Sequence, residues 1–120
     1  MNNIQRMQTS PRMSQAVTAN GFVFLAGQVA DNLQGDIAKQ TQQVLEKIER
    51  LLQEAGSDKS KLISVNMWLA DITHFNAMND AYENWLGGRD QPTRACAQST
   101  LADPNYLIEI TATALLNTGA

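Results

Sequence analysis

Apolar residues recur every three or four positions between Ile37 and Ala55, and this spacing predicts a long amphipathic helix. Gly35-Asp36 lies just before the stripe and Gly56 just after it, which suits a helix start and a C-terminal glycine cap. The apolar and small members of the stripe are Ile37, Thr41, Val44, Leu45, Ile48, Leu51, Leu52 and Ala55. We expect this face of the helix to pack on a sheet.

A second stripe predicts a helix from about Thr73 to Leu86, which Gly87-Gly88 ends. Its inner face consists of Ile72, Phe75, Met78, Tyr82, Trp85 and Leu86. His74 falls in the first turn and is expected at the surface, and Asp71 suits the N-terminal cap or the first turn.

Alternating and continuous apolar runs predict the strands. The dipeptide Asn20-Gly21 is a turn signal between Thr18-Ala19 and the run 22–26, so these segments predict a hairpin. Residues 63–70 alternate between apolar and polar side chains and predict a strand. Two more strands are expected at 94–100 and 106–116, joined as a hairpin around a turn at 102–105.

The resulting order is β-β-α-β-α-β-β, which predicts one α+β domain over residues 1–120, with two helices on one face of a single mixed sheet. In the last strand, Ile108, Ile110, Ala112 and Ala114 should face the helices, and Glu109, Thr111 and Thr113 should face away. Two helices leave the second sheet face uncovered. The preceding strand puts Arg94, Cys96 and Gln98 on a single face too, and a face of Thr, Gln and Cys is too mildly polar for a bare surface. We therefore expect it to pack on copies of itself around a shared axis.

Composition narrows the class of protein. The charged fraction is 18% and the hydrophobic fraction 43%, so polar uncharged residues fill much of the surface, as expected in an oligomer. A net charge of −3 without basic runs argues against a general nucleic-acid binder. The longest apolar run, 22–26, is too short for a membrane span, and the start of the chain lacks a signal-peptide core. One cysteine, Cys96, cannot form an internal disulfide. We therefore expect a cytoplasmic protein.

Two charged residues lie within runs that otherwise predict buried strands: Arg94 in residues 92–98 and Glu109 in residues 107–110. Burying either charge costs several kcal/mol unless a partner compensates it. One interpretation is an ion pair at a strand end. In the expected hairpin, however, the two residues are offset by about three positions, on the order of 10 Å. That spacing is too long for a salt bridge, but it suits a small molecule between them, or a cleft to which a neighbouring chain contributes one residue.

The motifs along the chain resemble the RidA/YjgF family, the reactive intermediate deaminases, over nearly the whole length. The resemblance is carried by the motifs 25–28 (LAGQ), 54–57 (EAGS), 67–71 (MWLAD), 79–82 (NDAY), 92–96 (PTRAC) and 108–110 (IEI). It implies a chorismate-mutase-like fold and a homotrimer with ligand clefts between subunits. It also implies hydrolysis of 2-imino or 2-amino-enoic acids to 2-keto acids and ammonia, with no metal or organic cofactor.

The resemblance also implies residue roles. Arg94 would bind the substrate carboxylate, and Gly27 would present its backbone N–H to the same carboxylate. Glu109 would orient and activate the attacking water, and the backbone around Cys96 would help to hold that water or the imine nitrogen. Two positions depart from the family pattern. Met13 stands where deaminases carry a tyrosine, and Ala26 stands where they carry a serine.

Two other functions remain open. The first is a non-catalytic sensor that keeps Arg94 as a carboxylate anchor, which the changes at Met13 and Ala26 favour. The second is a ribonuclease or translation inhibitor, against which the acidic balance and the lack of a histidine pair count. Cys96 is interpreted as a small buried hydrophobe rather than a redox thiol. A metal site is not expected, because the chain has a single histidine, His74, and a single cysteine.

Overall fold

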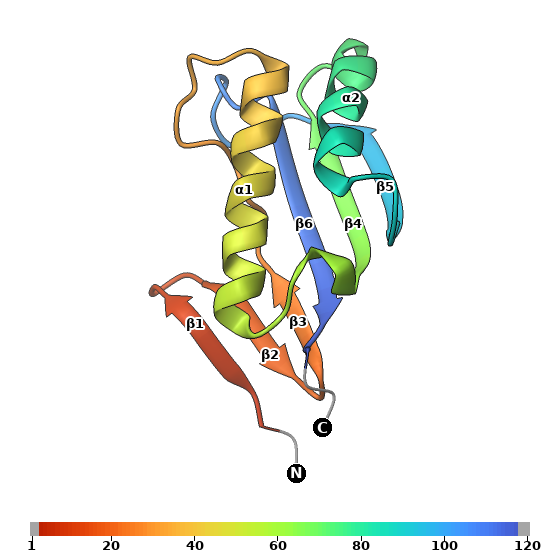
Figure 1. Ribbon diagram of the computed structural model, residues 1–120. Helices are drawn as coiled ribbons and strands as arrows, with labels where there is room; N and C mark the ends of the chain where they lie inside the picture. Colours follow the sequence, from red (N-terminus) through yellow and green to blue (C-terminus); the bar gives the residue numbers. More distant parts are fainter. Residues whose placement is uncertain (1–2, 118–120) are drawn as a thin grey trace.

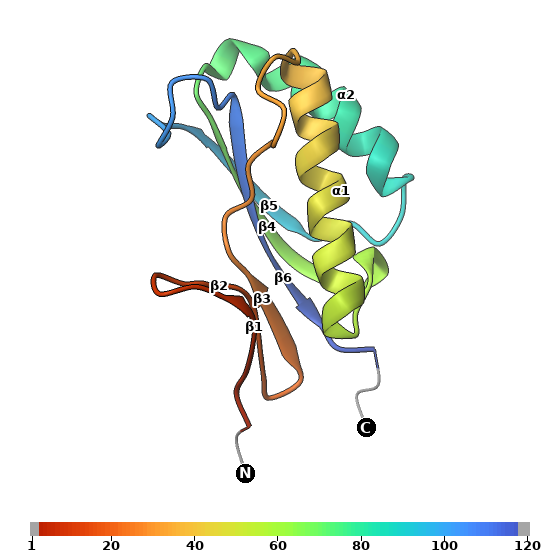
Figure 2. The same cartoon turned by 90° about the vertical axis from the view of Figure 1, so that its left-hand side faces the viewer.

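The computed structural model describes residues 3–117, and in them two helices cover one face of a six-stranded mixed sheet (Figures 1 and 2). The predicted α+β fold is therefore confirmed. The elements are β1 (Gln5–Thr9), β2 (Ser14–Ala19), β3 (Phe22–Leu25), α1 (Ile37–Ala55), β4 (Leu62–Leu69), α2 (Phe75–Leu86), β5 (Thr93–Gln98) and β6 (Ile108–Leu115). Short 3₁₀ turns at Lys59–Lys61 and Ile72–His74 precede β4 and α2. Neither helix in the described part of the chain is long and apolar enough to cross a membrane.

The ends of both helices follow from their capping residues. At α1, the Asp36 carboxylate accepts a hydrogen bond from the Lys39 backbone N–H at 3.0 Å, and Gly56 closes the helix with φ 91°. At α2, the Asp71 carboxylate accepts from both the backbone N–H and the hydroxyl of Thr73, so the chain forms a 3₁₀ turn before the helix begins. The same hydrogen bonds lower the pKa of Asp71.

The sheet order is β1-β2-β3-β6-β4-β5, and it corrects the expected hairpin between the last two strands. β4 lies between them, parallel to β5 and antiparallel to β6. A helix between two strands is the ordinary connection for parallel neighbours, and α2 connects β4 to β5 in this way. The turn near Asp103 does form, with Tyr106 N–H donating to the Asp103 carbonyl, but it belongs to a longer connection past the end of β4.

The first strand, β1, was absent from the sequence prediction. It is an edge strand whose residues are exposed except for half-buried Met7. Because both faces of such a strand meet solvent, its sequence carries no apolar alternation. The predicted β2–β3 hairpin is confirmed, with Asn20 and Gly21 both at positive φ in the turn.

The core lies between the helices and the sheet, and it confirms the predicted orientation of β6. Ile108, Ile110, Ala112 and Ala114 are buried, whereas alternate residues are partly exposed. A fully buried amide, Gln40 of α1, fastens the connection before β6. Its Nε2 donates to the carbonyl of Asn105, and its Oε1 accepts from the Leu107 N–H at 3.0 Å. Gln40 thereby fixes the start of the strand that carries Glu109.

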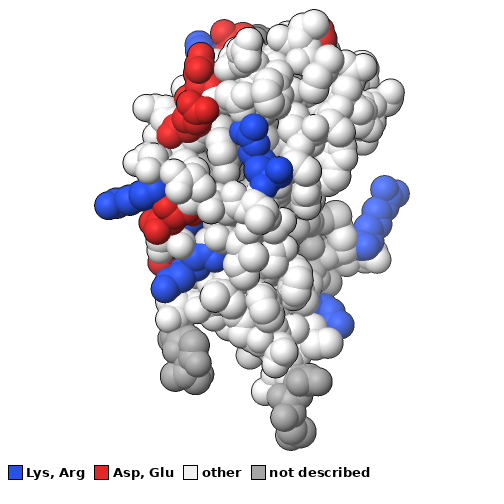
Figure 3. All heavy atoms as spheres, turned by 90° about the vertical axis from the view of Figure 1, so that its right-hand side faces the viewer, with Lys and Arg blue, Asp and Glu red and all other residues white. Residues whose placement is uncertain are grey.

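No element of the described chain covers the second sheet face, which we call the open face. Its positions in β3 to β6 are Phe22, Phe24, Ser64, Asn66, Trp68, Thr93, Ala95, Ala97, Glu109, Thr111, Thr113 and Leu115. Among these twelve described positions, Glu109 is the only charged residue. Phe24 is 46% exposed and Leu115 43%. In Figure 3 most of the visible acidic atoms lie toward the helices, on the left, and the right-hand part is mostly white, with Lys or Arg atoms at its edge.

Candidate functional site

Arg94 points to the helix side of the sheet, as Cys96 and Gln98 do, and not to the open face as the sequence predicted. Its exposed side chain lies against α2. Arg94 is the register partner of buried Val65 on β4, which sets its direction. Its Cζ lies 5.6 Å from the centre of the Phe75 ring and 5.2 Å from that of Tyr82. Its Nη1 donates to Asn79 Oδ1 at 2.5 Å. Within residues 3–117 no carboxylate pairs with Arg94, so its charge remains available to an anionic ligand.

Arg94 also shapes the electrostatics of its neighbours. Burial raises the pKa of the Cys96 thiol, and the positive charge of Arg94 opposes that shift. Burial likewise raises the pKa of the Tyr82 phenol, again opposed by Arg94. Cys96 is half-buried and packs against the core, so it is a neutral thiol, consistent with its interpretation as a small hydrophobe.

A hollow of about 440 Å³ adjoins Arg94 on the side of α2 and the following loop. It is lined by Tyr82, Glu83, Leu86, Gly88, Gln91, Pro92 and Arg94. Tyr82, Leu86 and Pro92 provide apolar surface, and Arg94 provides the positive charge. This combination can hold the apolar part of a small acid close to a carboxylate anchor.

Glu109 lies on the open face, with its carboxylate against the backbone of Gly27 and with Trp68 as its cross-strand neighbour. A Cβ atom placed on Gly27 would overlap Glu109 Oε2, so only glycine fits beside this carboxylate in its present position. Gln28 and Ile110 exchange two backbone hydrogen bonds, of 2.8 and 3.1 Å, which hold this segment against β6. The structure thus brings together Glu109, Gly27 and the adjoining Ala26.

The two positions that depart from the family pattern are Ala26, next to Gly27 in the sequence, and Met13. Half-buried Ala26 donates its backbone N–H to the Gln15 carbonyl at 2.9 Å, which attaches it to β2. Met13 lies two residues before Gln15, in the connection between β1 and β2, and is 43% exposed. Neither side chain offers a hydroxyl to a ligand near Glu109.

Arg94 and Glu109 do not form a site within one chain. Arg94 lies level with Val65 and Ala112, and Glu109 lies level with Trp68 and Ala97, so they are offset by three positions along the sheet. The predicted offset is therefore correct although the hairpin was wrong, because β4 carries the same register to both neighbours. An odd offset places the two side chains on opposite faces. Neither an ion pair between these two residues nor a small ligand held by both of them in one chain fits this geometry.

Sequence reasoning missed the contacts of Arg94 with Phe75, Asn79 and Tyr82. It assigned Phe75 and Tyr82 to the inner face of a helix, which their burial bears out, and gave Asn79 no role. Their i, i+4, i+7 spacing is the signal that could have found them. It places all three on one stripe of α2, and the β4-α2-β5 crossover brings that stripe over β5.

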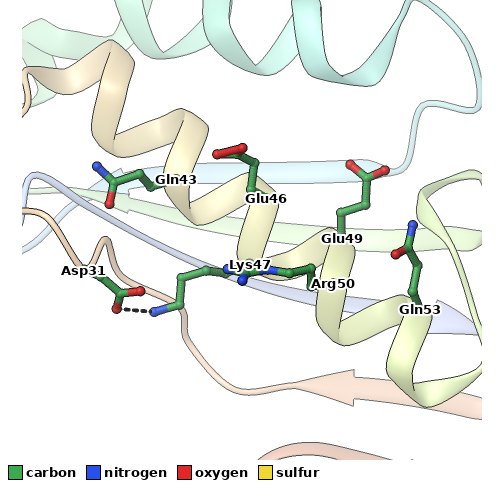
Figure 4. Close-up of a pocket in the computed structure, with 7 residues that line it drawn as sticks. All are labelled: Asp31, Gln43, Glu46, Lys47, Glu49, Arg50 and Gln53. Atoms are coloured by element: carbon green, nitrogen blue, oxygen red, sulfur yellow. Dashed lines mark hydrogen bonds and ion pairs between the residues drawn. The ribbon is translucent and has the colours of Figure 1, made fainter.

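Other polar features give no competing site. Figure 4 shows a hollow along the outer face of α1, lined by Asp31, Gln43, Glu46, Lys47, Glu49, Arg50 and Gln53. Its charges are of both signs, and Lys47 already donates to Asp31 and to the Val29 carbonyl. His74 is half-buried rather than at the surface as expected, and its Nδ1 has no partner among the described residues. Residues 3–117 contain no group of three or more metal-ligating side chains.

This α+β topology is combined with a glutamate whose carboxylate lies against a glycine and with an arginine that has no carboxylate partner in residues 3–117. Together these features characterise a class of small proteins. The chain belongs to the endoribonuclease L-PSP family, also called the YjgF/RidA family, whose sequence profile matches residues 3–116.

Individual relatives support this membership. A RutC family protein of Haemophilus ducreyi is 35% identical over 114 residues, which cover 95% of this chain and 97% of that protein. The RutC family protein YoaB of Escherichia coli is 35% identical over 107 residues, covering 89% and 93%. The crystal structure of a YjgF family member from Neisseria meningitidis superimposes with a TM-score of 0.93 at 38% identity, covering 96% of each chain.

Proposed function

We propose that this protein hydrolyses 2-imino acids, and the 2-aminoacrylate-type enamines that tautomerise to them, to 2-keto acids and ammonia. The reaction takes place in a cleft between two copies of the chain, with Arg94 from one copy and Glu109 from the next. The observation that carries the proposal is the division of the site. An arginine without a carboxylate partner and a glutamate against a glycine lie on opposite faces of one sheet.

Arg94 and Glu109, the two halves of the proposed site, divide the chemistry between them. Arg94 binds the substrate carboxylate through parallel hydrogen bonds and so fixes the position of the imine carbon. Glu109 accepts a proton from a water molecule as its oxygen bonds to that carbon. That proton passes to the imine nitrogen, which gives a carbinolamine. The hydroxyl proton then passes through Glu109 to the amino nitrogen, the carbon–nitrogen bond breaks with its electron pair on nitrogen, and ammonia leaves as the carbonyl forms. The outer edge of β5, which pairs with β4 alone in the described sheet, offers backbone groups near Cys96 to the water or the imine nitrogen.

A homotrimer supplies the neighbouring copies. The open face exposes Phe24 and Leu115, and Glu109 is the only charge at its positions in β3 to β6. A second copy on this face removes that apolar surface from water and can bring its own Arg94 toward Glu109. Three copies around one axis give three equivalent clefts.

Two observations favour other functions, and the experiment below separates them. Met13 and Ala26 supply no hydroxyl near Glu109, as expected of a sensor that binds small acids without turnover. The description of the family names an endoribonuclease. However, a net charge of −3 and a single histidine disfavour RNA cleavage.

The test couples amino-acid oxidases to the purified protein and follows the decay of each imine. The proposal predicts faster decay with the wild type and with Arg50→Ala, a control on the exposed face of α1, but none with Arg94→Ala. Binding of pyruvate without imine decay would establish the sensor. Cleavage of RNA that persists in Arg94→Ala, without imine decay, would establish the ribonuclease.

A further inference from the structure

We infer that Phe75, Asn79 and Tyr82 form a clamp that sets the orientation of Arg94 before a ligand arrives, and that the carboxylate docks on the Nε–Nη2 edge of the guanidinium. The inference rests on the proposed function only for the identity of the ligand. The clamp itself is a property of one chain.

One stripe of α2 carries the three residues that contact Arg94. Phe75, Asn79 and Tyr82 lie one turn apart on a single stripe of the helix, which is turned toward β5. The guanidinium carbon of Arg94 is 5.6 Å from one ring centre and 5.2 Å from the other, within the range of cation–π attraction. Two rings on the same stripe restrict the position of the guanidinium more than one ring could.

The free hydrogen-bond donors of Arg94 decide where a carboxylate can dock on the guanidinium. Asn79 Oδ1 accepts from Nη1, the terminal nitrogen on the side of Cδ. Within residues 3–117, neither Nε nor Nη2 contacts an acceptor. Two parallel hydrogen bonds to a carboxylate need two neighbouring nitrogens with free hydrogens. The Nε–Nη2 edge meets that condition, because neither of its nitrogens has an acceptor among the described residues.

Arg94 lies on an edge strand and is exposed, so without the clamp its long side chain would sample many rotamers. Preorganisation strengthens binding by removing the entropy lost when a side chain is fixed on association. Phe75, Asn79 and Tyr82 therefore act through Arg94 as positioning residues.

The experiment measures the clamp and the binding separately. Arg94 side-chain signals are assigned by nitrogen-15 NMR in ligand-free protein, and the rotation rate of its terminal nitrogens is compared among variants. Pyruvate affinity is measured by titration. The variants are Asn79→Ala, Tyr82→Leu and the conservative Tyr82→Phe, with Asn84→Ala as an exposed control on the same helix. Thermal unfolding checks that each variant folds.

The wild type and Asn84→Ala should show slow rotation of the terminal nitrogens and equal pyruvate affinity, and Tyr82→Phe, which keeps the ring, should keep slow rotation. Asn79→Ala should rotate faster and bind pyruvate about tenfold more weakly, as loss of one hydrogen bond to a charged group predicts. In the kinetics this loss should raise KM and leave kcat nearly unchanged. Tyr82→Leu should act in the same direction if it folds.

The outcomes separate this inference from the proposed function. Fast rotation in the wild type, or unchanged affinity and rotation in Asn79→Ala, would overturn the clamp even if imines are hydrolysed. Slow rotation that Asn79→Ala abolishes, with weaker pyruvate binding, would establish the clamp even if the wild type hydrolyses no imine.

Discussion

The two halves of the proposed site are held in different ways. Arg94 is positioned by side chains of α2, through two aromatic rings and one amide. Glu109 is positioned by backbone, with Gly27 against its carboxylate and the Gln28–Ile110 bridge beside it. Substitutions in α2 should therefore adjust ligand affinity gradually, whereas a side chain at position 27 should disable the Glu109 half outright.

The sharpest contrast between the halves should come from Glu109→Gln. The amide is nearly isosteric but cannot accept a proton from water. We expect kcat to fall by about a hundredfold to ten-thousandfold, with little change in pyruvate affinity. Steady-state kinetics and titration together measure the two effects. Weaker binding with unchanged kcat would instead assign Glu109 to substrate positioning.

Gly27→Ala tests whether the backbone of Gly27 positions the Glu109 carboxylate. The new Cβ would overlap the end of a flexible side chain, so the fold should survive while the carboxylate moves. We expect kcat to fall by about a hundredfold, toward the loss of general-base assistance, with pyruvate still bound by Arg94. Ala26→Ser, next to it in the sequence, is the control and should retain activity. Equal loss of pyruvate binding in Gly27→Ala would contradict the division into halves.

A charge introduced on the open face should separate the copies of the chain, and it should thereby separate Arg94 of one copy from Glu109 of the next. Thr113 is half-buried in the single chain and points to the face that lacks a cover. Thr113→Arg should weaken the trimer by about tenfold or more, because a charge buried between copies lacks a partner. Light scattering over a dilution series measures this change, with exposed Thr100→Arg as the control. A wild type that is a monomer at micromolar concentration would remove the basis for a shared cleft.

The smallest effect concerns the environment of Arg94. Burial raises the pKa of Cys96, and the positive charge of Arg94 opposes this rise. Alkylation of the thiol should therefore reach its maximum rate at a higher pH than for free cysteine, because the thiolate is the reactive form. Arg94→Ala should shift the profile to still higher pH. A shift to lower pH would show that Arg94 does not act on Cys96.

The sequence predicted most of the fold because its signals were local. The α1 stripe, the caps at Asp36 and Gly56, and the Asn20-Gly21 turn each act within a few residues. The sequence did not predict the pairing of β4 with β5, because a turn near Asp103 fits both a hairpin and a longer crossover. Edge strand β1 carried no apolar pattern to detect.

The candidate site was predicted less completely. The sequence singled out Arg94 and Glu109 as charges inside runs expected to be buried, but β5 is exposed except for half-buried Cys96. The roles of Arg94, Glu109 and Gly27 stay predictions. The placement of Arg94 and Glu109 on opposite faces depends on β4 lying between them, which is a property of the whole sheet. The contact of Asn79 with Arg94 depends likewise on the crossover that brings α2 over β5.

The most direct test of the account combines two inactive variants. Arg94→Ala and Glu109→Gln are co-expressed in equal amounts, so that trimers form from both chains. If each cleft takes Arg94 from one copy and Glu109 from the next, about a quarter of the clefts contain both native residues, and about a quarter of wild-type imine hydrolysis should return. No activity above that of the separate variants, in trimers proven to contain both chains, would contradict a site shared between copies.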